Sequence, residues 1–244
     1  MFMHKKRPIL ALIYDFDGTL SPGNMQEYAF IPQLGISPSV FWAQTRKRAR
    51  HDKADPILTY MCMMLEQAQA SGRLRITRQA FREYGRRIHL FPGVPGWFDR
   101  VNRYAASRRF QAEHYIVSSG LMEMIEGTPI ARHFHRVFAS SFTYDQHGVA
   151  RWPGVAVNYT TKTQFIFRIN KGVLDVSDTD GINAWMPEAS RPVPFHHMIY
   201  LGDGTTDVPC MRLVRDKGGH SLAVFNPRRK DGRDIHVSVT ISPI

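Results

Sequence analysis

The sequence predicts an α/β protein whose core is a doubly wound, mostly parallel sheet. Short apolar runs rich in β-favouring residues alternate with stretches that suit helices along most of the 244 residues. Several of these runs end abruptly in carboxylates, hydroxyls or glycine. Buried strands show this pattern where they deliver side chains to the carboxyl edge of an open sheet. A long segment of different character follows the first run and predicts a helical insertion.

The first strand and its loop are expected within residues 8–20. An apolar run, Ile9–Tyr14, stops at the segment Asp15–Thr19, which reads Asp-Phe-Asp-Gly-Thr. Aspartate and glycine also suit ordinary turns, so this segment alone is not decisive. Two carboxylates at the end of a buried strand nevertheless indicate a hard cation, a nucleophile or both.

Residues 21–88 are expected to form the helical insertion. They are rich in Met, Ala, Gln and Arg, and capping signals predict one helix over 56–69 and another over 78–88. The insertion divides the chain into two domains, because it separates residues 1–20 from residues 89–244, which together form the core.

The core elements resume near Pro92. We expect, in order, a helix over 94–107, a strand over 114–118, a helix over 121–125, strands over 137–142 and 149–152 joined by a turn, a helix over 161–171, a long loop over 175–194, a strand over 198–201 and a late strand and loop over 221–227.

Three later segments repeat the placement of polar residues at the end of an apolar run or the start of a helix. Residues Ser118–Gly120 end one predicted strand and precede a helix, whose first backbone N–H groups favour an anion. Lys162 lies near the start of another predicted helix. Asp203 and Asp207 follow the strand over 198–201. The core therefore offers carboxylates, hydroxyls and an ammonium group at places that can meet.

In this order the segments resemble the haloacid dehalogenase (HAD) superfamily, specifically its phosphoserine-phosphatase-like, magnesium-dependent phosphatases. The first and last segments are specific motifs, whereas a lone serine or lysine is not. The resemblance implies a Rossmann-like core with a helical cap inserted after the first strand. Asp17 favours phosphate chemistry, because a second aspartate can protonate an alkoxide leaving group and a dehalogenase needs no such proton.

The resemblance also implies roles for the site residues. Asp15 is the nucleophile that forms an aspartyl-phosphate, Asp17 is the general acid and base, and Lys162 pairs with Asp15 and the phosphoryl group. An Mg²⁺ ion is expected on these groups: Asp15, the main-chain carbonyl of Asp17, Asp203 and Asp207. The phosphate of the substrate is expected to contact the following residues: Gly18, Thr19, Ser118, Ser119 and Gly120.

Three of these assignments stay open. Lys171 competes with Lys162 for the lysine position, and Ser119 competes with Ser118 for the phosphoryl contact. Asp207 can bind the metal directly, bind it through water, or orient the ammonium group of the lysine.

The expected function is a magnesium-dependent phosphomonoester hydrolase that acts on a small phosphorylated metabolite. The alternatives are a phosphotransferase or a nucleotide phosphatase with the same site, and a non-catalytic regulatory protein that binds an anion or nucleic acid. The formal net charge of +11 attracts anions of all these kinds. No nucleic-acid-binding signature accompanies the charge, so nucleic acid is not the favoured partner.

Some residues outside the motifs are candidates for contacts with a substrate. The basic runs Arg46–Arg50 and Arg228–Lys230 are interpreted as solvated surface, although the first could contact a second anionic group of a substrate. Trp42 and Trp185 lie in stretches without a clear pattern and could approach a substrate.

The sequence predicts a cytoplasmic protein with no membrane partner. No apolar stretch approaches the roughly 20 residues that a membrane-spanning helix needs. The segment Met1–Tyr14 has basic residues before apolar ones, but it runs into Asp15 without the cleavage site of a signal peptide.

Overall fold

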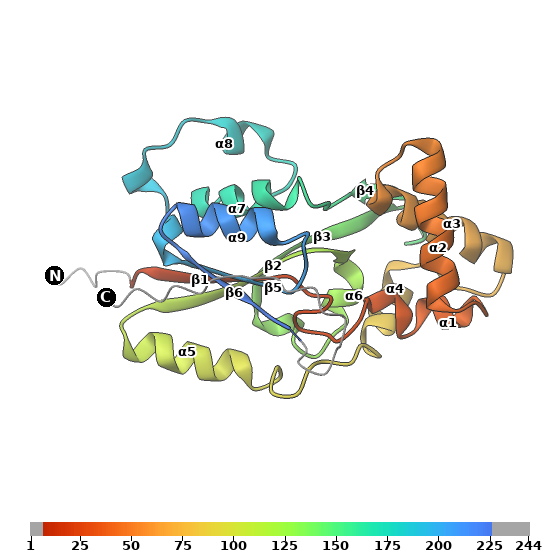
Figure 1. The fold of residues 1–244 in the computed structure, drawn as a ribbon, viewed down its shortest axis with the longest axis horizontal. Helices are drawn as coiled ribbons and strands as arrows, with labels where there is room; N and C mark the ends of the chain where they lie inside the picture. The colour runs from red at the N-terminus through yellow and green to blue at the C-terminus, as the bar shows by residue number, and fades with distance from the viewer. Residues whose placement is uncertain (1–6, 226–244) are drawn as a thin grey trace.

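The computed structural model describes residues 7–225 and shows a six-stranded sheet at its centre (Figure 1). The strands are β1 (Ile9–Tyr14), β2 (Gln111–Leu121), β3 (Phe134–Tyr144), β4 (Ala150–Val155), β5 (Met198–Gly202) and β6 (His220–Ala223). Their order in the sheet is β4-β3-β2-β1-β5-β6. Neighbouring strands run parallel except β4, which is antiparallel to β3. The predicted doubly wound, mostly parallel α/β sheet is therefore confirmed.

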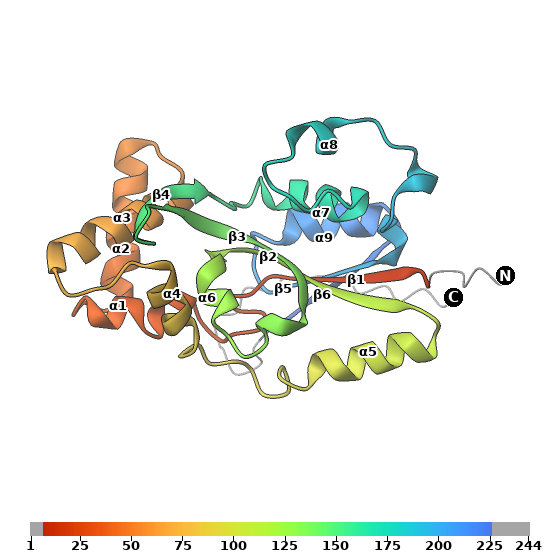
Figure 2. The ribbon, with the colours of Figure 1, turned by 180° about the vertical axis from the view of Figure 1, so that it is seen from behind.

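Helices cover both faces of the sheet. Figures 1 and 2 show α5 (Trp97–Ser107) and α6 (Met122–Glu126) on one face, and α7 (Lys162–Lys171) and α9 (Val208–Asp216) on the other. A further short helix, α8 (Thr179–Asn183), lies beyond α7. These helices cover the faces of the sheet and do not cover the carboxyl ends of β1 and β5. The site lies at these strand ends.

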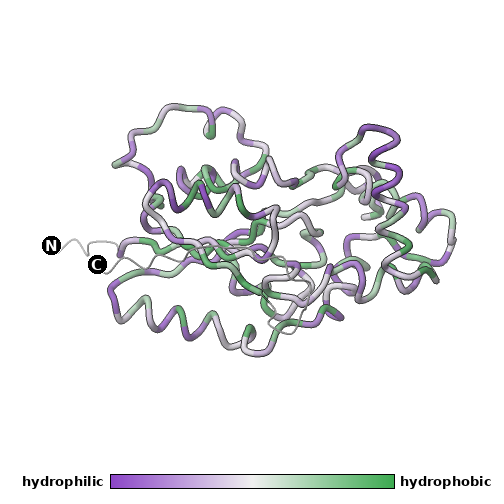
Figure 3. Tube along the Cα trace, in the orientation of Figure 1, coloured by the Kyte–Doolittle hydropathy of each residue, from purple (hydrophilic) through white to green (hydrophobic). Residues whose placement is uncertain are grey.

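Two hydrophobic cores follow from the alternation of side chains along β1. Leu12 and Tyr14 belong to the core on the side of α5, whereas Ala11 and Ile13 belong to the core under α7 and α9. Figure 3 shows hydrophobic residues along the central strands, and hydrophobic and hydrophilic residues alternating along α5. Because β1 is buried on both faces, its whole sequence is apolar up to Asp15.

The chain between β1 and α5 forms a group of helices beyond one end of the sheet (Figures 1 and 2). These are α1 (Phe30–Gln33), α2 (Pro38–Asp52), α3 (Pro56–Ser71) and α4 (Arg78–Gly85). Ser37 and Asp55 cap α2 and α3 by accepting hydrogen bonds from the first backbone N–H groups, and a proline follows each cap.

Backbone hydrogen bonds attach this group of helices to the hairpin of β3 and β4. The N–H of Ala150 donates to the carbonyl of Ile76 at 2.8 Å, and the N–H of Arg78 donates to the carbonyl of Gly148 at 3.0 Å. The side chains of α3 and α4 also belong to the core that contains Leu12 and Tyr14. The helices and the sheet therefore share one continuous apolar interior on this side.

The structure corrects several expected elements. The expected loop over 175–194 contains α8 and a 3₁₀ helix, η3 (Glu188–Ser190), and the Asp178 carboxylate starts α8 by accepting from the Gly181 N–H at 2.7 Å. The expected helix over 78–88 ends at Gly85. The remaining 3₁₀ helices are η1 (Met25–Glu27), η2 (Ala131–His133) and η4 (Phe195–His197).

Trp42 lies in the regular helix α2 and not in a stretch without pattern. The buried residues of α2, Phe41, Thr45 and Ala49, are four apart, so they form a narrow stripe among charged residues. Such a stripe gives a weak helical signal in the sequence. The end of the expected loop over 221–227 and the basic run Arg228–Lys230 lie outside the described residues.

Candidate active site

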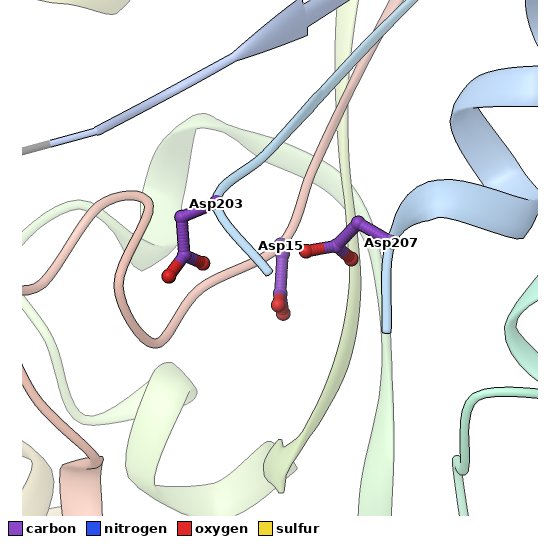
Figure 4. Close-up of side chains that lie close together, drawn as sticks. All are labelled: Asp15, Asp203 and Asp207. Atoms are coloured by element: carbon purple, nitrogen blue, oxygen red, sulfur yellow. The ribbon is translucent and has the colours of Figure 1, made fainter. Parts of the chain in front are cut away.

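Three aspartates meet at the carboxyl edge of the sheet. Asp15 follows β1, Asp203 follows the adjacent β5, and Asp207 lies directly before α9. One carboxylate oxygen from each lies within 4.8 Å of the other two, and Figure 4 shows the three side chains converging. The Asp15 N–H donates to the carbonyl of Leu201 at 2.9 Å, which extends the pairing of the two strands up to the site.

Lys162 lies between two of these aspartates. Its Nζ atom is 2.9 Å from Asp15 Oδ2 and 2.7 Å from Asp207 Oδ1, and the side chain is 1% exposed. The competing Lys171 donates instead to the carbonyls of Ile182 and Ala184, in the segment that contains α8. Of the two candidate lysines, the structure therefore brings only Lys162 to the aspartates.

The carboxylate of Asp207 accepts three hydrogen bonds inside the protein. Oδ1 accepts hydrogen bonds from Lys162 and from the Tyr200 hydroxyl at 2.8 Å, and Oδ2 accepts one from the Gly204 N–H at 3.2 Å. Asp207 is 0% exposed. The geometry therefore favours orientation of the lysine over an open position for a ligand.

Negative charge is in excess at this edge. Burial raises the pKa of Asp15 to about 6, and the Lys162 ammonium only partly offsets that effect. Burial, and then the neighbouring Asp207, raises the pKa of Asp203. Burial alone would lower the pKa of Lys162, but Asp15 and Asp207 outweigh it and raise this pKa. A hard divalent cation fits these carboxylate oxygens, since it would neutralise the charge that one ammonium group leaves uncompensated.

Asp17 lies next to this group but outside it. Its Oδ1 atom accepts a hydrogen bond from the Met25 N–H at 3.0 Å. Burial, followed by the charge of Asp15, raises the pKa of Asp17 well above its usual value. A carboxyl group with a raised pKa beside a buried carboxylate is suited to hold a proton and to donate it.

The structure places Gly18 and Thr19 against Asp203. Gly18 has φ +84°, and a Cβ atom there would lie 2.1 Å from Asp203 Oδ2, so only glycine fits without displacing that carboxylate. The buried Thr19 donates its hydroxyl hydrogen to Asp203 Oδ1 at 3.1 Å. Both residues therefore orient Asp203, and their expected contact with phosphate stays a prediction.

Ser118, Ser119 and Gly120 lie together at the end of β2. The Ser118 hydroxyl oxygen accepts a hydrogen bond from the Gly120 N–H at 3.1 Å, and the Ser119 carbonyl accepts one from the Tyr60 hydroxyl at 2.7 Å. All three face the same cavity, so the choice between Ser118 and Ser119 stays open.

This cavity, of about 250 Å³, joins the site to the inserted helices. Its lining consists of Asp15, Asp17, Asn24, Gln26, Trp42, Ile57, Tyr60, Ser118, Ser119, Gly120, Tyr159, Asp203, Gly204 and Thr206.

Sequence reasoning missed most of the residues that the segment between β1 and α5 contributes to the cavity lining. Gln26, Ile57 and Tyr60 carry no signal of their own, because in sequence they resemble ordinary helix residues. Trp42 does line the cavity, whereas Trp185 is 86% exposed and lies elsewhere.

The basic run Arg46–Arg50 does not line this cavity. Arg48 of this run pairs instead with Asp52 and Glu66 on the surface. The expected contact between this run and a second anionic group of the substrate therefore finds no support in the geometry.

Comparison with known proteins decides the family. A family model for haloacid dehalogenase-like hydrolases matches residues 12–212, which is most of the chain. The chain belongs to the haloacid dehalogenase-like hydrolase family. The predicted family is thereby confirmed, as is the prediction that the chain is an enzyme of a hydrolase class. An uncharacterized protein of Borreliella burgdorferi is 27% identical over 259 residues, covering 96% of this chain and 89% of that protein.

Solved structures of this family share the fold. A HAD family hydrolase from Salmonella enterica serovar Typhi has a TM-score of 0.55 at 17% identity, covering 90% of this chain and 69% of that one. A substrate-bound phosphoserine phosphatase has a TM-score of 0.56 at 11% identity, covering 91% of this chain and 95% of that one. At these low identities the likeness establishes only that the folds are similar.

Proposed function

We propose that this hydrolase is a magnesium-dependent phosphomonoesterase that works through an aspartyl-phosphate on Asp15. The observation that carries the proposal is the position of the Asp15 carboxylate. It faces the cavity beside Asp203, and its Oδ2 atom lies 2.9 Å from Lys162 Nζ. An anionic nucleophile, a fixed ammonium group and a carboxylate pair for a cation are what phosphoryl transfer requires.

In the first half of the reaction, an Asp15 oxygen forms a bond to phosphorus while the bond from phosphorus to the ester oxygen breaks. Asp17 gives its proton to that departing oxygen, which leaves as an alcohol. Asp15 is held for this attack from two sides, because Oδ1 accepts from the Phe16 N–H at 2.7 Å and Oδ2 accepts from Lys162.

In the second half, Asp17 takes a proton from a water molecule whose oxygen attacks the phosphorus. The bond between phosphorus and Asp15 then breaks, and inorganic phosphate leaves. The Ser118 hydroxyl accepts from the Gly120 N–H and can also donate its own hydrogen to a phosphoryl oxygen.

A bound Mg²⁺ would be held by the carboxylates of Asp15 and Asp203 and the main-chain carbonyl of Asp17. It supplies positive charge that offsets the repulsion between the carboxylate and the phosphate. We assign Asp207 to Lys162, because the hydrogen bonds from Lys162, Tyr200 and Gly204 already engage both of its oxygens. Any contact of Asp207 with the ion is then through water.

We also propose that residues 21–88 are a cap that shapes the substrate site. Gln26, Trp42 and Tyr60 come from this segment and form one wall of the cavity. The cavity size suits a small phosphorylated metabolite.

Within residues 7–225, none of the helices is both long enough and apolar enough to cross a bilayer. The cytoplasm is the compartment that we propose.

The test is hydrolysis of an aryl phosphate by the purified chain, with magnesium and with excess chelator. We expect turnover that stops in chelator and that Asp15→Asn abolishes, since the amide is no nucleophile. Asp216→Asn is the matched control, because Asp216 is exposed on α9 and its one ion pair within residues 7–225 is with Arg215. Turnover that persists in chelator or in Asp15→Asn would refute the proposal, and salt-dependent nucleic-acid binding without turnover would favour the regulatory alternative.

A further inference from the structure

The part of the cavity lining that α2 and α3 contribute is an aromatic surface held by hydrogen bonds. Trp42 Nε1 donates to Glu27 Oε1 at 2.7 Å. The Trp42 and Tyr60 rings pack edge to face with their centroids 5.8 Å apart. The Tyr60 hydroxyl donates to the Ser119 carbonyl, so the wall is anchored to the backbone beside the proposed phosphoryl position. Ile57 adds an aliphatic surface to this wall.

The charged side chains that line the cavity are all acidic, and a bound Mg²⁺ would be engaged by Asp15, Asp203 and the phosphate rather than by the leaving group. Asp15, Asp17 and Asp203 line the cavity, and no lysine or arginine of the described chain is among its lining residues. Lys162 is buried behind Asp15, where Asp15 and Asp207 engage its ammonium group. A leaving group that carries a carboxylate would therefore enter without a cationic partner, which is costly in a partly desolvated cavity.

We propose that the natural leaving group is a small, uncharged alcohol that bears an apolar or aromatic ring, and not an amino acid or a carboxylated metabolite. This inference rests on the proposed phosphatase function. The ring lies on the surface formed by Trp42, Tyr60 and Ile57. The cavity of about 250 Å³ is below the usual range of roughly 300–1,000 Å³ for ligand pockets, so it admits one ring beside the phosphate.

The experiment compares 4-carbamoylphenyl phosphate with 4-carboxyphenyl phosphate. The two esters match in size and shape and differ in charge, and their leaving groups have similar acidity. Acetyl phosphate, which carries no ring and releases acetate without needing a proton from Asp17, reports the attack of Asp15 on phosphorus by itself. We expect kcat/KM to be at least about tenfold higher for the carboxamide than for the carboxylate, and O-phosphoserine to be as poor as the carboxylate.

Two single substitutions locate the effect in the cavity. Ile57→Lys places an ammonium group in the lining and should narrow the preference for the carboxamide by at least about threefold. Leu58→Lys is the matched control, because Leu58 is the next residue on α3, is 40% exposed and does not line the cavity. It adds the same net charge and should leave the ratio of the two substrates unchanged.

The outcomes separate this inference from the proposed function. If acetyl phosphate is hydrolysed but the carboxylate or O-phosphoserine is turned over as well as the carboxamide, the inference is refuted and the phosphatase stands. An equal change of the ratio in Ile57→Lys and Leu58→Lys also refutes it, because the selectivity then lies outside the cavity. If acetyl phosphate and both aryl esters are inert with magnesium, the proposed function and the inference fail together.

Discussion

The Asn158 side chain donates a 2.7 Å hydrogen bond to Asp55 Oδ2, and this bond joins the inserted helices to the loop before Lys162. Asp55 caps α3 with its other oxygen. Asn158 organises its loop, since its Oδ1 atom accepts from the N–H groups of Thr160 and Thr161 and its carbonyl accepts from the Lys162 N–H. The start of α3 and the start of α7 are therefore held by one pair of side chains.

Exchanging Asp55 and Asn158 should keep the stability and the activity that a single substitution of either residue lowers. Asn158→Asp sets two carboxylates against each other and should cost about 1.5–3 kcal/mol of unfolding free energy, with a fall in kcat as the Lys162 loop shifts. The double variant Asp55→Asn with Asn158→Asp restores a donor and an acceptor and should recover most of both losses. Urea unfolding and turnover of an aryl phosphate measure the cycle, and additive losses would show that the two residues are not coupled.

Lys162 and Lys171 are a natural pair for testing the buried ammonium group. Lys162→Met leaves Asp15 and Asp207 buried without a cation, so we expect about 3–5 kcal/mol of destabilisation and loss of activity. Lys171→Met removes hydrogen bonds to two carbonyls away from the aspartates, and it should cost about 1 kcal/mol and leave turnover near that of the wild type. Equal losses of activity in the two variants would contradict the assignment of Lys162.

The sequence predicted the site residues at the carboxyl ends of strands and missed most of the residues that the inserted helices contribute to the cavity. Asp15, Ser118 and Asp203 stand at the ends of apolar runs, and parallel strands bring such ends to one edge whatever the details of packing. The cavity wall depends instead on how α2 and α3 pack on the hairpin of β3 and β4. No local pattern in Trp42 or Tyr60 encodes that long-range packing.

Two glycines with similar positive φ angles allow the effect of backbone strain to be separated from the effect of a steric contact. Gly18→Ala forces a Cβ into the Asp203 carboxylate at φ +84°, whereas Gly35→Ala at φ +74° meets nothing within 4 Å. Both should lose about 1–2 kcal/mol from the left-handed backbone. Only Gly18→Ala should also lose most of its magnesium-dependent turnover, because Asp203 must move. Thermal unfolding and a magnesium titration of activity measure the two effects, and an active Gly18→Ala would remove Asp203 from the proposed metal site.

His114 should make the protein sensitive to mild acid. The residue is 2% exposed, and its Nδ1 atom lies 2.9 Å from the Tyr14 hydroxyl, which itself accepts a hydrogen bond from Trp97 Nε1. The Tyr14 hydroxyl therefore donates to Nδ1, and the Nε2 hydrogen donates to Asn102 Oδ1 at 3.0 Å. This arrangement requires a neutral imidazole with its proton on Nε2.

Burial, followed by the charge of His133, lowers the pKa of His114 to about 4 from an ordinary value of 6.5. The unfolded chain therefore binds this proton at a higher pH than the folded chain. The contribution of His114 to the free energy of unfolding is fully present above about pH 6.5 and falls by up to about 3 kcal/mol as the pH drops towards 4.

His114→Gln keeps an uncharged donor and acceptor and should not show this part of the loss. Other groups titrate in the same range, so the test is the difference in urea-unfolding free energy between wild type and His114→Gln, measured at pH 7 and at pH 4.5. A difference that does not change between the two pH values would show that His114 accepts its proton in the folded protein as readily as in the unfolded chain.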